Sequence, residues 1–385
     1  MLSKNIIFKN FLKIKNKKKI KKDFQNLLKD QPLFFKTLQP KYRYDYSKKI
    51  INKYKKYSSI RIIGMGGSIL GTKAIYSFLK KKIKKKIIFV DNLSSNVDYF
   101  QNKNINLNLI ISKSGNTIET ITNANMLIKR NEKNIIITEN KDSYLTNLAK
   151  ELQAEIIEHK NYIGGRYSVL SEVGMLPAEL MNLDESKFKQ FNKLVKNNFF
   201  VKNLINNVSA NLNLIKQGKH TSIILNYDEQ SKDLFKWYQQ LIAESLGKKS
   251  KGIMPLVSSM PKDNHSLMQL FLDGPKKSFY TFFDVLDNNN IEINKRNIFN
   301  SHKFLKNKSI DKIKQSQMLA TENVFISKKI PFRSFRILKR SEQSLGELFC
   351  FFMLEVILLG KALNVNPYDQ PSVELIKKET KKILS

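Results

Sequence analysis

This chain carries the segment Ile111-Ser-Lys-Ser-Gly-Asn-Thr-Ile-Glu-Thr120, in which an apolar strand that begins at Leu107 ends in small hydroxyl residues and a helix begins. Backbone N–H groups in the first turn of a helix have no acceptors within the helix, and the helix dipole makes that end partly positive. The hydroxyls of Ser112, Ser114 and Thr117 would add hydrogen bonds to a bound anion. The junction therefore predicts a phosphate site, and its plain alternative is an ordinary serine-rich helix cap.

A second junction of the same chemistry lies upstream in the segment Ser59-Ile-Arg-Ile-Ile-Gly-Met-Gly-Gly-Ser68. Ligands of an open parallel sheet bind beyond the carboxyl ends of its strands, so both turns are expected to face one crevice. Neither turn has the Gly-Lys-Ser/Thr ending of a nucleoside triphosphate site. Ile69 stands where a dinucleotide fingerprint would have its third glycine, which argues against that cofactor too.

Apolar strands and helical stretches alternate along two parts of the chain, which is typical of parallel sheets with helices on both faces. Strands are expected at 60–63, 87–90, 107–111, 135–137 and 155–157, and again at 221–225, 252–257, 279–285 and 335–337. Helices are expected at 233–246, 344–363 and 370–384, and an asparagine-rich surface excursion at 287–306. The prediction is an α/β fold with a helical segment at 1–55, a phosphate-binding module at 56–185 and a second module with the C-terminal helix at 186–385.

Composition excludes several classes of protein. A chain of 385 residues with 41% hydrophobic content is long enough for two domains with cores. The net charge of +35 would suggest nucleic acid or an anionic membrane, but the excess is lysine spread along the chain. Runs such as 17–22 and 80–86 flank helices, where a solvated face is usual. A lysine-rich nucleic-acid binder would instead gather basic residues and aromatics on one face, so no nucleic-acid partner is expected.

Cysteine usage and hydropathy point to the cytoplasm. Cys350 is the single cysteine and cannot form an intrachain disulfide, which fits a reducing compartment. The longest apolar stretch, 348–359, is interrupted by Glu355 and is too short to span a bilayer. The N-terminus lacks the apolar core of a signal peptide, so we expect no membrane association.

Four further motifs follow the two turns in order: Gly164-Gly-Arg-Tyr-Ser168, Ala243-Glu-Ser-Leu-Gly-Lys248, Asp263-Asn-His-Ser266 and Asn366-Pro-Tyr-Asp-Gln-Pro-Ser-Val-Glu374. Together these segments resemble the glucose-6-phosphate isomerase family from about Ile60 to the C-terminus. The resemblance implies two flavodoxin-like sugar-isomerase modules, a hexose 6-phosphate substrate of glycolysis and gluconeogenesis, and no metal or cofactor. It also implies a homodimer whose active sites are completed by the neighbouring subunit. Ser372 stands where the family commonly has glycine, a change that should be tolerated.

Interconversion of an aldose and a ketose needs a ring opener, a base and a cation that stabilises an enediolate. Glu244, near a helix end marked by Gly247, is the candidate base. His265 opens a helix after a Pro-Lys-Asp-Asn turn and, titrating near neutrality, could pass a proton to the ring oxygen. Arg166 follows two glycines and offers a permanent cation to the enediolate. Each would otherwise be interpreted as a solvated side chain, and the family match favours the catalytic role.

The resemblance assigns Lys377 to ring opening beside His265, Gln370 to the phosphate end, and Glu119 to orienting the ring-opening groups. If a helix starts at Pro371, Gln370 and Lys377 lie about two turns apart on one face. The expected substrate-binding residues are Gly67, Ser68, Ser112, Lys113, Ser114, Thr117, Glu119 and Gln370. The catalytic residues are Glu244, His265, Lys377 and Arg166.

Two alternatives keep the same fold. A sugar-phosphate-sensing module would need the phosphate turns but not Glu244, His265 and Lys377, whose joint presence argues against it. An isomerase acting on both glucose and mannose 6-phosphate would need a base and a ring opener that accept the C2 epimer, and this alternative stays open.

Overall fold

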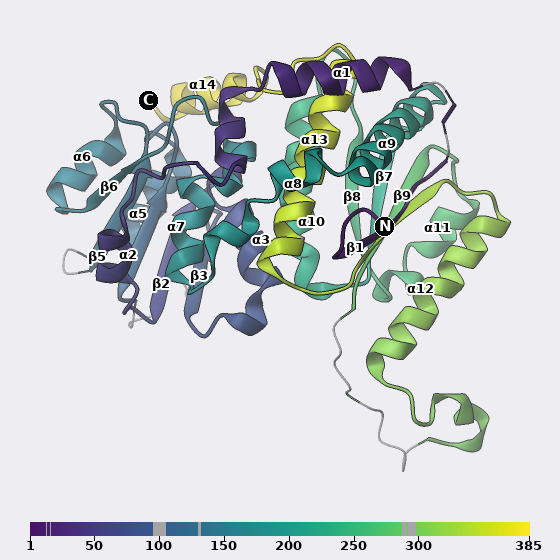
Figure 1. Ribbon diagram of the computed structural model, residues 1–385. Coiled ribbons are helices and arrows are strands. Elements are labelled where there is room, and N and C mark those ends of the chain that lie inside the picture. Colours follow the sequence, from purple (N-terminus) through teal and green to yellow (C-terminus); the bar gives the residue numbers. More distant parts are fainter. Residues whose placement is uncertain (13, 16, 95–104, 130–131, 287–290, 292–297) are drawn as a thin grey trace.

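Two parallel-sheet modules lie side by side, with helices packed between them (Figure 1). The computed structural model describes residues 1–12, 14–15, 17–94, 105–129, 132–286, 291 and 298–385. The predicted α/β class with two such modules is therefore confirmed. The exact boundaries at 55/56 and 185/186 stay predictions.

The first sheet contains five parallel strands in the order β3-β2-β4-β5-β6. These strands are β2 (Ser59–Gly64), β3 (Lys86–Val90), β4 (Leu107–Ile111), β5 (Lys133–Thr138) and β6 (Glu155–Glu158). All six residues of β2 and all five of β4 are buried, as expected for central strands covered on both faces. Its helices include α2 (Lys48–Tyr54), α3 (Leu70–Phe78), α5 (Ile118–Leu127), α6 (Tyr144–Glu151) and α7 (Glu172–Leu180).

The second sheet has the order β1-β10-β9-β7-β8. Its strands are β1 (Ile6–Lys9), β7 (Thr221–Asn226), β8 (Met254–Ser259), β9 (Ser278–Val285) and β10 (Phe332–Ile337). Ile224 faces a core shared with the central helices, whereas Ile223 and Leu225 face a cluster with α11 and α12. Alternate residues of the same strand therefore point to opposite faces of the sheet, and helices cover both faces.

The expectation of helices throughout residues 1–55 is wrong at β1, which pairs antiparallel with β10. Ile6 and Phe8 are buried while Ile7 and Lys9 are exposed, which is the two-residue period of an edge strand. Only two inward residues carry this signal, and the lysine-rich surroundings obscured it. Helix α1 (Lys18–Lys29) follows as expected.

The helices of the second module are α8 (Phe191–Val195), α9 (Asn198–Lys216), α10 (Lys232–Leu246), α11 (Met268–Asp273), α12 (Ile310–Ser327), α13 (Glu342–Ala362) and α14 (Val373–Leu384). Helix α13 is buried along nearly its whole length and packs against α9 and α10. Half of the predicted excursion at 287–306 lies outside the described residues, and its described part includes a short 3-10 helix, Asn300–Leu305. Within the described residues, none of the helices combines the length and the hydropathy that a membrane span needs.

A buried polar network joins α13 to the second sheet. The Arg333 guanidinium forms an ion pair with Glu355 and donates to Asn207 and Tyr238 at 2.9 and 3.0 Å. The Glu355 carboxylate also accepts from Tyr238 at 2.6 Å and from Asn211 at 3.0 Å. Because every charged group has partners, the ion pair is compatible with complete burial.

Candidate active site

The two predicted turns lie next to each other at the carboxyl ends of β2 and β4. Gly64 pairs with Ile111 in the sheet, and a Cβ added to Gly64 would lie 2.9 Å from the Ile111 carbonyl oxygen. Beyond the strands, the Ser112 and Thr117 hydroxyls are 2.8 Å apart. Thr117 is the N-cap residue of α5, but its side chain makes no capping hydrogen bond. The first turn of α5 therefore keeps backbone N–H groups for an anion beside two hydroxyls.

The remaining residues of the phosphate turn have separate surroundings. Ser114 is exposed, and its hydroxyl accepts a hydrogen bond from the Asn116 backbone. The Lys113 ammonium donates to the Asn161 carbonyl at 2.7 Å, and burial lowers the pKa of this lysine. Glu119 lies half-buried in the first turn of α5.

The loop that carries Arg166 touches the first glycine turn directly. A Cβ at Gly67 would lie only 2.2 Å from the Gly165 carbonyl carbon, so no other residue fits without a backbone shift. The Ser168 hydroxyl donates to the Gly67 and Gly165 carbonyls at 3.2 and 2.7 Å. Ser68 follows half-buried in the same short 3-10 turn, Gly66–Ser68. These contacts place Arg166 beside the two turns that are predicted to bind phosphate.

Arg166 is 1% exposed and is the most heavily hydrogen-bonded side chain of this region. Its guanidinium donates to the Ser245 hydroxyl at 2.8 Å, to Gln370 Oε1 at 2.6 Å and to Glu244 Oε2 at 3.1 Å. It also donates to the carbonyls of Pro367 and Asp369 at 2.7 and 3.0 Å. The buried cation therefore joins the first module, α10 and the C-terminal segment at one point.

The Glu244 carboxylate is fixed at both oxygens. Oε2 faces Arg166, and Oε1 accepts from Gln240 Nε2 at 2.9 Å, one turn earlier on α10. The glutamate side chain is 27% exposed, so it is oriented by protein groups while it stays accessible to a substrate. The Gln240 side chain also approaches the glycine turn Gly66–Ser68, since a Cβ at Gly66 would lie 2.9 Å from the Gln240 amide nitrogen. The arrangement therefore gives an oriented carboxylate that is open to the outside and lies next to a buried cation.

Gln370 does not lie on the same helix face as Lys377, which corrects the expectation of a helix that starts at Pro371. Helix α14 begins at Val373, after a turn at residues 371–372, so Gln370 lies outside the helix. The proline at 371 also disfavours helical conformation at Gln370 itself. Gln370 instead lies in the segment before α14, where its Oε1 accepts a hydrogen bond from Arg166. The Lys248 ammonium holds this segment too, at 2.6 Å from the Asp369 carbonyl oxygen.

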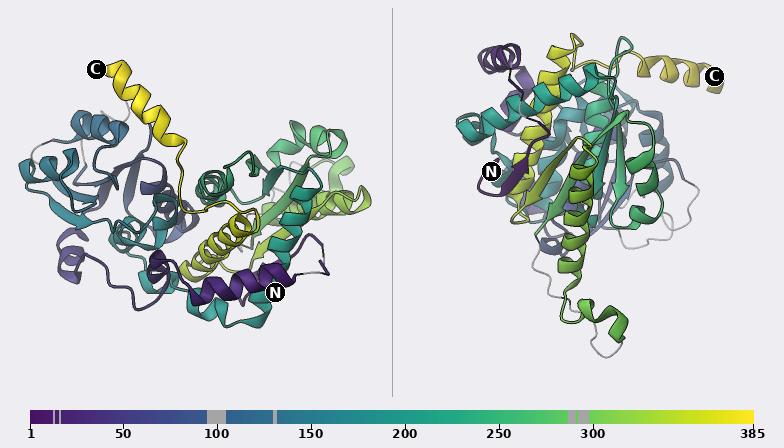
Figure 2. Two further views of the ribbon diagram at one scale, coloured as in Figure 1. Left: turned by 90° about the horizontal axis from the view of Figure 1, so that it is seen from above. Right: turned by 90° about the vertical axis from the view of Figure 1, so that its right-hand side faces the viewer.

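Lys377 lies away from the buried cation. Helix α14 has no buried residue and extends outward from the body, most clearly in the right-hand view of Figure 2. The Lys377 ammonium is 2.6 Å from Glu374 on the same helix. Among the described residues, no hydrogen bond joins Lys377 to Arg166, Glu244 or Glu119.

His265 is also separated from Glu244 within the chain. It ends the exposed 3-10 turn Lys262–His265 after the carboxyl end of β8, whereas Glu244 lies in the helix that precedes the amino end of β8. The 6 residues of that strand span about 20 Å. Of the other histidines, His159 is buried, and desolvation lowers its pKa to about 4, so it is a poor acid–base group at neutral pH.

Sequence analysis missed three residues that build this site. Gln240 lies four positions before Glu244 on one helix face, and Ser245 and Lys248 belong to the glutamate motif. Helical spacing from Glu244 could have indicated Gln240. The partners of Lys248 and Ser245 come from distant parts of the chain and have no local signal.

The phosphoglucose isomerase family model matches residues 45–385. The glucose-6-phosphate isomerase of Methanocaldococcus jannaschii is 36% identical over 349 residues, covering 85% of each chain. That of Mycoplasmopsis pulmonis is 32% identical over 84% of this chain and 82% of its own.

Solved structures share the fold. A hypothetical protein from Thermus thermophilus gives a TM-score of 0.83 at 22% identity, covering 95% of this chain and 94% of its own. A Chlamydia trachomatis glucose-6-phosphate isomerase gives 0.72 at 20% identity, over 87% and 71% of the two chains. By its sequence match and its relatives, this chain belongs to the phosphoglucose isomerase family.

Proposed function

We propose that this protein interconverts glucose 6-phosphate and fructose 6-phosphate in the cytoplasm, through ring opening and an enediolate intermediate. The observation that carries the proposal is the buried Arg166 cation, which holds the accessible Glu244 carboxylate beside two phosphate-binding turns. Glu244 moves the proton between C2 and C1, and Arg166 stabilises the charge that develops on the enediolate oxygens. A sensing module would have no use for this pair.

A coupled assay tests the proposal directly. Purified protein should convert fructose 6-phosphate to glucose 6-phosphate, which a dehydrogenase then oxidises with a change in absorbance. Absence of conversion by the folded protein at high substrate concentration would contradict the proposal.

The phosphate end lies at Ser112 and Thr117, with Gly67, Ser68, Lys113 and Ser114 around it. Ser112→Ala and Thr117→Ala should each raise KM more than they lower kcat, because each removes a hydrogen bond to a charged acceptor worth about 1.5–3 kcal/mol. Steady-state kinetics measure the split, with Ser316→Ala on exposed α12 as the matched control. Unchanged KM in both variants would place the phosphate elsewhere.

We assign ring opening to His265 and Lys377, and we propose that Glu119 orients them. Because His265 would serve the site of a neighbouring subunit, this assignment requires a homodimer. His265 lies at the far end of β8 from Glu244, which fits a role in a neighbouring subunit's site. Helix α14 exposes apolar side chains of which Leu375, Ile376, Ile383 and Leu384 are 68–75% exposed, as expected of a helix that packs only in the assembly. We propose that this packing carries Lys377 to the substrate.

Subunit mixing tests the shared site. When His265→Ala and Glu244→Gln proteins exchange subunits, one site of each hybrid carries both lesions and the other carries neither. Activity should rise from near zero to roughly a quarter of wild type, because about half of randomly formed dimers are hybrids.

The matched control mixes Glu244→Gln with Arg166→Met. Glu244 and Arg166 contact each other within one chain. Each site of a hybrid therefore carries one of the two lesions, and no site is intact. Rescue in the control, or no rescue of the His265 mixture despite proven exchange, would show that the site is not divided in this way.

A further inference from the structure

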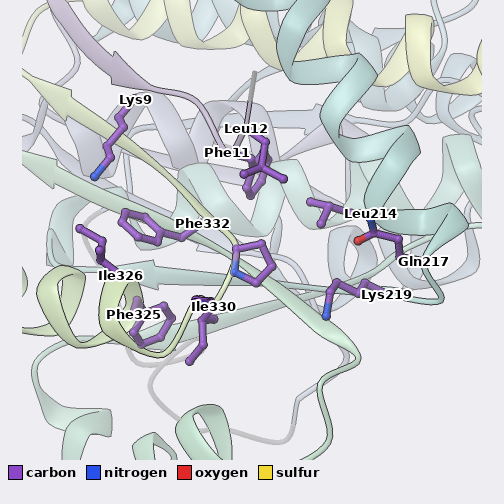
Figure 3. Close-up of a pocket in the computed structure, with 12 residues that line it drawn as sticks. Lys9, Phe11, Leu12, Leu214, Gln217, Lys219, Phe325, Ile326, Ile330 and Phe332 are labelled. Carbon is purple, nitrogen blue, oxygen red and sulfur yellow. The ribbon is translucent and has the colours of Figure 1, made fainter. Parts of the chain in front are cut away.

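A pocket of about 380 Å³ lies at the amino ends of β7 and β10, with aromatic rings in its wall (Figure 3). Most of its exposed apolar surface comes from Leu12 and Ile326, which are 50% and 54% exposed. Phe11 and Phe332 add ring edges that are 9% and 6% exposed, and Phe325 is fully buried. Parts of the wall come from β1, from the ends of α9 and α12, and from the loop before β10. Pockets of this size and apolar character are typical of sites for small organic ligands.

The charged residues around this pocket are lysines. Lys9, Lys219 and Lys329 line it, and none of its 12 lining residues is acidic. The Lys9 ammonium lies 4.7 Å from the centre of the Phe332 ring, and Figure 3 shows Lys9 and Lys219 on opposite sides of the pocket with Phe332 beside Lys9. Outside the lining, the partly buried Glu322 carboxylate is close enough to Lys9 for charge interaction.

A neighbouring pocket of about 480 Å³ extends the same surface and shares Lys219 and Lys329. It adds Lys276 and Lys328, and its single acidic residue, Asp273, is already paired with Lys328 at 2.8 Å. The first pocket is therefore mainly apolar inside, and the second adds a polar, lysine-rich edge to it.

Lys219 is crowded by like charges. Its ammonium donates to the Lys276 carbonyl at 2.5 Å, and a Cβ on Gly218 would lie 3.7 Å from the Lys277 ammonium. Burial, followed by the charges of Lys276 and Lys277, lowers the pKa of Lys219. An anion bound here would relieve this repulsion between neighbouring ammonium groups. Lysines that are scattered over a surface repel one another too little for an anion to gain in this way.

We propose that this lysine-edged aromatic pocket binds an organic anion with an aromatic body and one carboxylate. The body would pack against Leu12, Ile326 and the ring edges of Phe11 and Phe332, and the carboxylate would accept hydrogen bonds from Lys219 and Lys329. No lining residue belongs to the proposed isomerase site, and none is hydrogen-bonded to Arg166 or Glu244 among the described residues. The ligand therefore binds without competing with the hexose phosphate.

Titration calorimetry on the full chain tests the site with three probes: 2-naphthoate, the neutral 2-naphthylmethanol and inorganic phosphate. We expect 2-naphthoate to bind at least ten times more tightly than either of the others, since only it satisfies both the aromatic wall and the lysines. A double variant, Lys219→Gln with Lys329→Gln, should weaken 2-naphthoate at least tenfold. Saturating glucose 6-phosphate should leave its affinity unchanged.

The matched control is Lys21→Gln with Lys312→Gln, which removes two exposed lysines outside both pockets. Both double variants should keep wild-type isomerase rates, which shows that they fold. Equal affinity of the two double variants, or displacement of 2-naphthoate by glucose 6-phosphate, would overturn the proposal. The proposal would also be overturned if the protein bound anionic lipid vesicles more tightly than 2-naphthoate and the Lys219→Gln/Lys329→Gln variant lost that binding. Such a result would identify a membrane-facing surface instead.

Discussion

Glu244→Gln is expected to lower kcat by about two to four orders of magnitude, because the amide cannot accept the C2 proton. Substrate binding should change little. Glutamine keeps an oxygen for Arg166, and the Gln240 side chain can rotate so that its buried Oε1, which has no partner now, accepts from the new amide. The variant therefore removes basicity while it preserves the hydrogen-bond pattern around it.

Steady-state kinetics in both directions measure this effect, with Glu229→Gln, an exposed glutamate before α10, as the matched control. The control should keep wild-type turnover. If Glu244→Gln retained more than a tenth of wild-type kcat, the base would have to be another residue.

Glu355→Leu should lower the free energy of unfolding by about 3–5 kcal/mol, because Arg333 would be left buried without its counter-ion. Arg333 is 1% exposed, so neither a small rearrangement nor surface water can replace the lost carboxylate. Tyr238 and Asn211 would also lose their acceptor. This network lies outside the proposed active site, so the expected loss is one of stability.

Urea unfolding followed by fluorescence of Trp237 measures the change. Trp237 is the single tryptophan, is 1% exposed, and packs at 4.8 Å between ring centres against Phe349 of α13. The matched control, Arg333→Met with Glu355→Leu, removes both charges and should regain part of the stability. A loss below about 1 kcal/mol in the single variant would mean that the charges are better solvated than their burial indicates.

Much of the fold follows from local sequence pattern. Most strands of both modules contain short apolar stretches between helical segments, such as residues 87–90 in β3 and 135–137 in β5, so the parallel sheets were predictable. Strand β1 was not predictable, because only two of its residues, Ile6 and Phe8, point inward. They are buried only when β1 pairs with the edge of the sheet at β10. The start of α14 at Val373 was not predictable from Pro371, because proline is equally at home in the first turn of a helix and in the turn that precedes it.

The candidate site was predictable only in part, for a related reason. Ser112 and Gly67 lie in short motifs whose strand-to-helix geometry is local, and the structure places their turns together. The environment of Arg166 depends on Ser245, Pro367 and Asp369, which are distant in sequence and contribute hydroxyl or backbone oxygens. A backbone carbonyl has no residue identity, so no motif could have indicated it.

The contacts between Arg166 and the carbonyls of Pro367 and Asp369 set an order of events during protein synthesis. Domains generally fold in sequence as the chain leaves the ribosome, so the first module can form while the C-terminal segment is still being made. Until that segment emerges, the Arg166 guanidinium lacks three of its acceptors, Pro367, Asp369 and Gln370. A chain that stops before residue 367 is therefore expected to lack an oriented cation, however well its sheets are formed.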